Sequence, residues 1–204
     1  FESFYFAFAG WANVVAILPP FVTSVGLFVD ADEGKIHDTL KTVRLDCLQF
    51  HGNETPEFCA QFGMPYVKAC RVRRGVDLLE YWRAFDDASA WLADAWVEEY
   101  GGVGTGFDWA LLPPRIERPL VLSGGLAPGN VAAAIRQVRP WAVDVSSGVE
   151  SAKGIKDASR IHDFGRAALV HQQQPAHELD PLPAREQRED VDVVRAAGIV
   201  EHHP

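Results

Sequence analysis

The chain is poor in the residues that mark a metal site, a disulfide framework or a nucleic-acid surface. Its 204 residues include only three cysteines, Cys47, Cys59 and Cys70, with no C-x-x-C pair, and its seven histidines form no H-E-x-x-H pattern. This spacing disfavours zinc sites and disulfides and predicts reduced thiols in a cytoplasmic protein. The formal net charge of −9 argues against the broad basic face that nucleic acid requires.

A long uninterrupted hydrophobic run is also missing. Residues 4–24 carry no charge, but Pro19 and Pro20 would interrupt a spanning helix, and no basic flank is present. Glu2 disagrees with the positive leading region of a signal peptide. We therefore expect a buried helix over Ala9–Leu18 and no membrane segment.

Short apolar runs alternate with helix-like segments over most of the chain. The expected strands are Val22–Val29, Asp46–Phe50, Tyr66–Val72, Ser89–Ala95, Leu120–Leu122 and Ala142–Val145. The expected helices are Asp30–Arg44, Thr55–Phe62, Val76–Phe85, Phe107–Leu112, Asn130–Val138 and Ile155–Leu169. This alternation predicts βα units and a parallel sheet, an α/β fold.

The last two expected strands each run into a turn of small residues. Ser123-Gly124-Gly125 follows the first of them, and Ser146-Ser147-Gly148 follows the second. Glycine allows close backbone approach to a ligand, and exposed N–H groups attract an anion. Two such turns on consecutive parallel strands are typical of the phosphate site of a (β/α)8 barrel. The sequence therefore predicts a phosphorylated small-molecule ligand.

The composition changes near His171. Residues 171–204 are rich in glutamine, proline and charge and show little apolar periodicity. We interpret residues 1–170 as one (β/α) barrel domain and 171–204 as a polar, disordered tail.

Several motifs occur in a fixed order along the chain. They are Leu48-Gln49 with His51-Gly52, Gly101-Gly102-x-Gly104 with Phe107-Asp108-Trp109, Leu122 to Leu126 with Pro128 and Asn130-Val131, and Val143 to Glu150 with Gly154 and Lys156-Asp157. In order and spacing they resemble phosphoribosylanthranilate isomerase over about Leu18–Leu169. The resemblance implies a TIM (β/α)8 barrel of tryptophan biosynthesis that needs no cofactor and no metal. It also implies a phosphorylated substrate and a monomeric or homodimeric enzyme.

The reaction implied is an Amadori rearrangement of N-(5-phosphoribosyl)anthranilate. Asp94, seven residues before Gly101, matches the general acid of the family. The substrate- and phosphate-binding positions matched are Gln49, His51, Gly102, Gly104, Gly124, Gly125, Asp144, Ser147 and Gly148. The competing interpretations are tight turns for the glycines, an ordinary strand-end aspartate for Asp94, a buried and hydrogen-bonded carboxylate for Asp144, and a structural role for His51.

One family motif has no counterpart in the chain. The family begins with a strand carrying Lys-x-Cys-Gly, whose cysteine is the general base, and the 204 residues contain no such motif. Strand 1, helix 1 and strand 2 are expected to be absent, which leaves six readable strands and an N-terminally incomplete domain. An arginine that grips the substrate carboxylate in the family would fall near Phe4, and none occurs there. Cys59 lies in an expected helix, and Cys47 starts an expected strand at the end opposite the active-site mouth. Cys70 is the best placed of the three to replace the base, but it is expected to pack in the core.

Three explanations of the missing motif stay open. The sequence is a fragment of a full enzyme, or its missing N-terminal elements are supplied by another chain or segment, or it is a catalytically impaired or inactive homologue that retains only the phosphate-binding half. A related sugar isomerase of histidine synthesis is a further alternative. Its larger substrate requires two phosphate sites, and only one is evident in the sequence.

Overall fold

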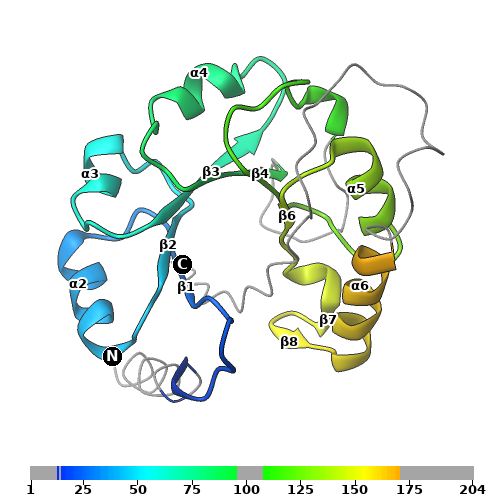
Figure 1. Cartoon of the computed structure of the whole chain (residues 1–204), viewed down its shortest axis with the longest axis horizontal. Helices are drawn as coiled ribbons and strands as arrows, with labels where there is room; N and C mark the ends of the chain where they lie inside the picture. The colour runs from blue at the N-terminus through cyan, green and yellow to red at the C-terminus, as the bar shows by residue number, and fades with distance from the viewer. Residues whose placement is uncertain (1–12, 14, 96–107, 171–204) are drawn as a thin grey trace. The chain divides into compact units, whose positions relative to one another are not determined.

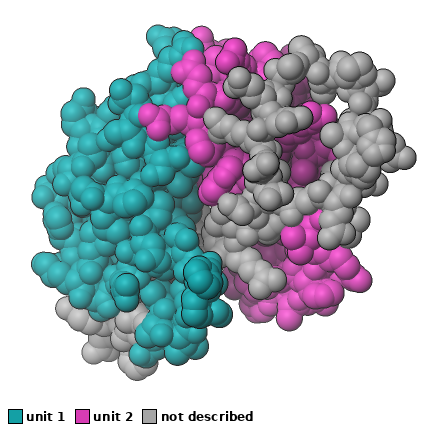
Figure 2. All heavy atoms as spheres, viewed as in Figure 1, with its two compact units in different colours: residues 1–70, 80–91, 195–204 teal, residues 71–79, 92–194 magenta. Residues whose placement is uncertain are grey.

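The computed structural model describes residues 13, 15–95 and 108–170 and divides the chain into two compact units. Unit 1 contains residues 1–70, 80–91 and 195–204, and unit 2 contains residues 71–79 and 92–194 (Figure 2). Six parallel strands follow one another in chain order in one sheet, from β1 to β6 (Figure 1). The predicted α/β class is therefore confirmed.

Unit 1 begins with alternating strands and helices. Its elements are β1 (Val25–Phe28), α2 (Glu33–Thr42), β2 (Cys47–Phe50), α3 (Pro56–Ala60), most of β3 (Tyr66–Val72), most of α4 (Leu78–Arg83) and the start of β4 (Ala90–Ala95). β1 pairs in parallel with β2, and β2 with β3. Helices α2 and α3 lie along the same side of these strands (Figure 1).

The helix starts in unit 1 follow local sequence signals. Asp32 and Thr55 are the N-cap residues of α2 and α3, and each side chain accepts a hydrogen bond from a backbone N–H in the first turn. Pro56 takes the first position of α3, as predicted from the sequence.

Aromatic rings fill the core of unit 1. Phe50 of β2 packs against Phe58, Phe62 and Tyr66, with ring centroids 5.7–6.1 Å apart. Because all residues of β2 are buried, the strand has apolar neighbours on both faces, as expected of a parallel sheet.

Unit 2 holds the second half of the sheet. Its elements are the end of β4, a 3-10 turn η1 (Trp109–Leu111), β5 (Leu120–Leu122), α5 (Val131–Val138), β6 (Ala142–Val143), a 3-10 turn η2 (Ser147–Val149), β7 (Glu150–Ala152), β8 (Ile155–Lys156) and α6 (Ala158–Val170). β5 and β6 pair in parallel, whereas β7 and β8 form a separate antiparallel hairpin. Val131, Ala134, Ile135 and Val138 form the buried face of α5.

The structure corrects three predicted boundaries in unit 2. The expected strand 142–145 ends at Val143, where the backbone turns into the small-residue segment. The expected helix 155–169 begins at Ala158, because Ile155 and Lys156 pair with β7 and Asp157 accepts hydrogen bonds from the next backbone N–H groups. The expected helix 107–112 is a 3-10 turn of three residues.

The expected buried helix 9–18 is described at residues 13 and 15–18. None of these residues is buried and Ile17 is 81% exposed, so the prediction of a buried segment is wrong for this part. The glycine-rich loop 101–106 and the tail 171–204 lie outside the described residues. Among the described helices, none combines the length and the hydrophobicity of a membrane-spanning segment.

Candidate active site

The turn after β5 is possible only with glycine. The φ angle is +83° at Gly124 and +66° at Gly125, in the left-handed region that other residues rarely adopt. A Cβ atom on Gly124 would lie 2.2 Å from the backbone nitrogen of Ala95 and 2.8 Å from Oδ1 of Asp94. The absence of a side chain therefore lets this turn lie directly against the end of β4, beside Asp94.

The turn after β6 meets the first turn through backbone atoms. A Cβ atom on Gly148 would lie 1.8 Å from the carbonyl oxygen of Leu126 and 3.1 Å from the Cα of Ala127. Main chain cannot rotate away as a long side chain can, so this contact also requires glycine. The two turns that the sequence predicted as a phosphate cradle are in direct contact within unit 2.

Asp144 links the ends of β5 and β6. Its backbone N–H donates to the Leu122 carbonyl at 2.9 Å, and its Oδ2 accepts a hydrogen bond from Ser123 Oγ at 3.0 Å. Ser123 is 8% exposed. The carboxylate thus holds the start of the first turn, which is compatible with the structural reading of Asp144. Its contact with substrate stays a prediction.

Asn130 braces the loop that leads from the first turn to α5. Its Oδ1 accepts from Ala127 N at 2.8 Å, and its Nδ2 donates to the Gly125 carbonyl at 2.9 Å. The side chain therefore fixes the glycine turn instead of capping its own helix. Asn130 was predicted as part of a motif, but its role in holding the turn was not predicted. The local sequence signal for that role is an asparagine just before a helix.

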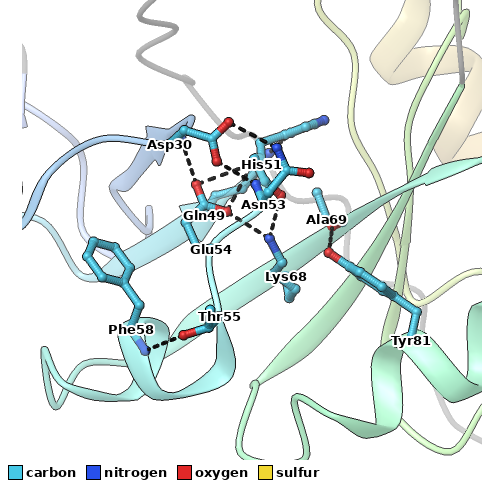
Figure 3. A network of polar contacts seen from close by, with 11 residues as sticks. Asp30, Gln49, His51, Asn53, Glu54, Thr55, Phe58, Lys68, Ala69 and Tyr81 are labelled. Carbon is cyan, nitrogen blue, oxygen red and sulfur yellow. Dashed lines mark hydrogen bonds and ion pairs between the residues drawn. The ribbon is translucent and has the colours of Figure 1, made fainter.

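In unit 1, Gln49 and His51 point toward one another near the end of β2 (Figure 3). Gln49 Nε2 lies 3.1 Å from His51 Nδ1, and the His51 N–H donates to the Phe28 carbonyl at 2.9 Å. The two residues predicted as substrate contacts are thus paired with each other through their side chains.

A buried carboxylate organises the loop that follows His51. Glu54 Oε1 accepts from the backbone N–H of Asp30 at 2.9 Å, and Oε2 accepts from that of Gly52 at 3.0 Å (Figure 3). Asp30 in turn accepts from Asn53 N at 2.6 Å. A Cβ on Gly52 would lie 2.4 Å from Asp30 Oδ1, so the loops after β1 and β2 meet at a glycine.

Lys68 completes this network from β3. Its Nζ lies 2.7 Å from Glu54 Oε2 and 2.8 Å from the Gly52 carbonyl, and the two side chains are 0% and 2% exposed. Neither Glu54 nor Lys68 was predicted from the sequence to belong to a site. The only signal was a lysine inside the apolar strand 66–72.

The three cysteines are free and buried. Burial raises the pKa of Cys47 to about 11 and that of Cys59 to about 12. Because a thiol needs its thiolate form to accept a proton, these two groups are poor bases near neutral pH. Cys70 is 6% exposed in β3, in agreement with its expected packing role.

The proposed contacts Gly102 and Gly104 fall outside the described residues. Among the side chains that are described, no group of three or more His, Cys, Asp and Glu residues could hold a metal ion.

Comparison with known proteins gives a consistent result. Residues 12–167 match the family model of N-(5'-phosphoribosyl)anthranilate (PRA) isomerase. The chain is 54% identical over 159 residues to N-(5'-phosphoribosyl)anthranilate isomerase of Nitrosospira multiformis, covering 78% of this chain and 76% of the relative. It is 57% identical over 154 residues to the Thiobacillus denitrificans protein of the same name, covering 75% of each.

Solved structures agree. The phosphoribosyl anthranilate isomerase of Thermotoga maritima is 41% identical, with a TM-score of 0.71 and coverage of 78% of both chains. A second crystal structure of a phosphoribosyl anthranilate isomerase is 38% identical, with a TM-score of 0.67 and coverage of 78% of this chain and 77% of that one. The chain belongs to the N-(5'-phosphoribosyl)anthranilate isomerase family.

Proposed function

We propose that this protein isomerises N-(5-phosphoribosyl)anthranilate to 1-(2-carboxyphenylamino)-1-deoxyribulose 5-phosphate in tryptophan biosynthesis. The observation that carries the proposal is the contact between two glycine turns and Asp94. The first turn lies against Asp94, and the second lies against the first. A phosphate held by these turns is therefore close to a carboxyl group that can transfer a proton.

In the proposed reaction Asp94 is the general acid. It donates its proton to the ribose ring oxygen while the bond from that oxygen to C1 breaks and the anthranilate nitrogen forms a double bond to C1. A base then removes the proton at C2, giving an enolamine. Tautomerisation moves a proton to C1 and leaves the C2 ketone. No net atom is gained or lost, as an isomerisation requires.

Gly124, Gly125, Ser147 and Gly148 are proposed to hold the 5-phosphate. Backbone N–H groups in glycine turns can bind an anion in a protein of net negative charge. A fixed phosphate also keeps the sugar in register with the acid, which lowers the entropic cost of reaching the transition state. One solved relative, 38% identical, is a complex with reduced 1-(o-carboxyphenylamino)-1-deoxyribulose 5-phosphate, which supports this class of ligand.

Gln49 and His51 are retained as proposed substrate contacts of unit 1, and Asp144 as one of unit 2. No base is assigned among the described residues, because the chain contains no Lys-x-Cys-Gly motif.

We further propose that the six strands correspond to strands three to eight of a (β/α)8 barrel. A phosphoribosylanthranilate isomerase of Thermotoga maritima is described as dimeric, which keeps a homodimer among the proposed states beside the monomer. The free thiols of all three cysteines favour a reducing compartment, and we propose the cytoplasm.

Turnover and binding test the proposal separately. Asp94→Asn keeps an oxygen that can accept from Ala95 N, a contact of 2.9 Å in the structure, so the fold should persist. We expect kcat to fall by roughly 10²–10⁴-fold. Affinity for the reduced product analogue, measured by calorimetry, should change little.

Asp163→Asn on α6 is the matched control, since this carboxylate lies in an exposed ion pair with Arg166. If the Asp94 and Asp163 variants had equal turnover, the assignment of Asp94 as the general acid would be wrong. Tight analogue binding without any turnover by the wild-type chain would support the alternative of a phosphate-binding homologue that is catalytically impaired.

A further inference from the structure

The side chain of Lys156 folds back from the β7–β8 hairpin onto the turn after β6. Its Nζ lies 2.9 Å from the Ser146 carbonyl oxygen, 3.2 Å from Ser146 Oγ and 2.8 Å from Glu150 Oε1. An ammonium group has three donors. The three described contacts therefore account for its full donor capacity.

The Ser146 carbonyl belongs to the peptide that leads into the second glycine turn. It accepts hydrogen bonds from Lys156 Nζ at 2.9 Å and from the Val149 backbone N–H at 3.4 Å, and the shorter of the two is the bond from Lys156. In a trans peptide the C=O and the following N–H point in opposite directions within one rigid plane. Holding the Ser146 oxygen toward Lys156 therefore aims the Ser147 N–H away from the hairpin. Lys156 can set the direction of a backbone donor without touching the ligand.

The hairpin is itself anchored on both sides of the turn. Glu150 pairs with Lys156 across the two strands, and its Oε2 accepts from Gly154 N at 3.1 Å. The Asp157 N–H donates to the Val149 carbonyl at 2.8 Å. The hydrogen bond from Lys156, followed by that from the Gly154 backbone, holds the pKa of Glu150 below its usual range. Lys156 therefore faces a charged carboxylate, and the pair has no net charge.

We propose that Lys156 is a positioning residue for the substrate phosphate, acting by orienting the Ser146–Ser147 peptide. This inference rests on the proposed function, because it assigns a task within the same cradle. Positioning outweighs direct attraction here, since Glu150 neutralises the ammonium and Lys156 is 45% exposed to screening solvent.

The test is titration of the full chain with inorganic phosphate, followed by calorimetry at a temperature where every variant is folded. Lys156→Met should weaken phosphate binding by about tenfold or more, since the Ser146–Ser147 peptide keeps only the longer bond from Val149 N to hold its direction. Lys156→Arg keeps the charge and donors that reach a carbonyl and a carboxylate, so it should restore most of the affinity. Lys153→Met is the matched control: it removes a positive charge from the loop of the same hairpin and should change affinity by less than about twofold.

Each outcome has a distinct meaning. If wild type does not bind phosphate, the proposed function of the cradle fails, and the role of Lys156 fails with it. If wild type binds and Lys156→Met binds equally well, only the positioning role is overturned. Equal losses in the Lys153 and Lys156 variants would replace positioning by general attraction. A drop in thermal midpoint without a drop in affinity would leave Lys156 as a purely structural residue, which also contradicts the proposal.

Discussion

The loops of unit 1 and the turns of unit 2 bring strand ends together in two different ways. In unit 1 the Glu54 carboxylate accepts the backbone N–H groups of Asp30 and Gly52 and is itself paired with Lys68. In unit 2 the closest contacts at Gly124 and Gly148 are made with main-chain atoms. The ion pair of Lys156 and Glu150 takes no part in these glycine contacts.

The two regions differ in the source of the anion that accepts their backbone N–H groups. A carboxylate that receives backbone N–H groups does what a bound phosphate would do at such a turn. Unit 1 therefore contains its own anion, and we assign its network to shaping the loop beside His51. The anion proposed for unit 2 is the substrate's. Substitutions in the two regions should consequently have different effects. Those in unit 1 should lower the free energy of unfolding, and those in unit 2 should lower the affinity for phosphate.

The largest expected effect is the loss of one partner of the buried pair in unit 1. Glu54→Ala leaves the ammonium of Lys68 buried at 0% exposure without its carboxylate. Such a change typically costs about 3–5 kcal/mol of unfolding free energy, measured by urea denaturation. The double variant Glu54→Gln/Lys68→Met removes both charges and should cost clearly less than the sum of the single changes.

The exposed pair of Lys41 and Asp38 provides the control for this prediction. Its side chains are 74% and 77% exposed, so Lys41→Met should leave the denaturation curve nearly unchanged. If Glu54→Ala were equally harmless, unit 1 would not depend on its internal anion, and the contrast with unit 2 would disappear.

The sequence predicted best what depends on neighbouring residues. The Thr55-Pro56 helix start and the two glycine turns were predicted because cap and turn chemistry acts over a few positions. The pairing of Lys68 with Glu54 was not predicted, because its partners are 14 residues apart and meet only after β2 and β3 align.

The β7–β8 hairpin was missed for a related reason. Its strands contain three and two residues, and they carry charged side chains instead of an apolar alternation. Gly154, with φ at +78°, was the one local turn signal. Consequently the candidate phosphate turns could be read from the sequence, whereas the residues that hold them in place could not.

The second largest effect is expected from a substitution that disrupts the backbone contact between Gly148 and Leu126 in unit 2. Gly148→Ala places a methyl group where the Leu126 carbonyl lies, 1.8 Å away, so the two turns must separate. We expect phosphate affinity to fall by more than about tenfold, whereas the overall loss of stability should be smaller than that of Glu54→Ala. Calorimetry and urea denaturation of the same samples measure the two effects.

Gly129→Ala is the control for this substitution. It makes the same chemical change in the loop before α5, where an added Cβ would meet nothing within 4 Å. Its affinity should match that of wild type. A Gly148 variant that binds phosphate normally would show that the cradle does not need the close contact, which would undermine the proposed site.

The smallest expected effect is a pH dependence from the outer pair of unit 2. The pKa of Glu150 lies below its ordinary value of 4.5 in the folded protein, chiefly through the hydrogen bond from Lys156. A lowered folded-state pKa means that the unfolded chain binds the proton first as pH falls. The stabilisation from Glu150 is therefore complete above about pH 4.5 and is lost as pH falls through the lower folded value.

Urea denaturation between pH 7 and pH 3 should show this loss in wild type, and Glu150→Gln should flatten that part of the profile. An identical profile in the variant would mean that the Lys156–Glu150 pair adds nothing to folding, and the contrast with the buried pair of unit 1 would then be complete.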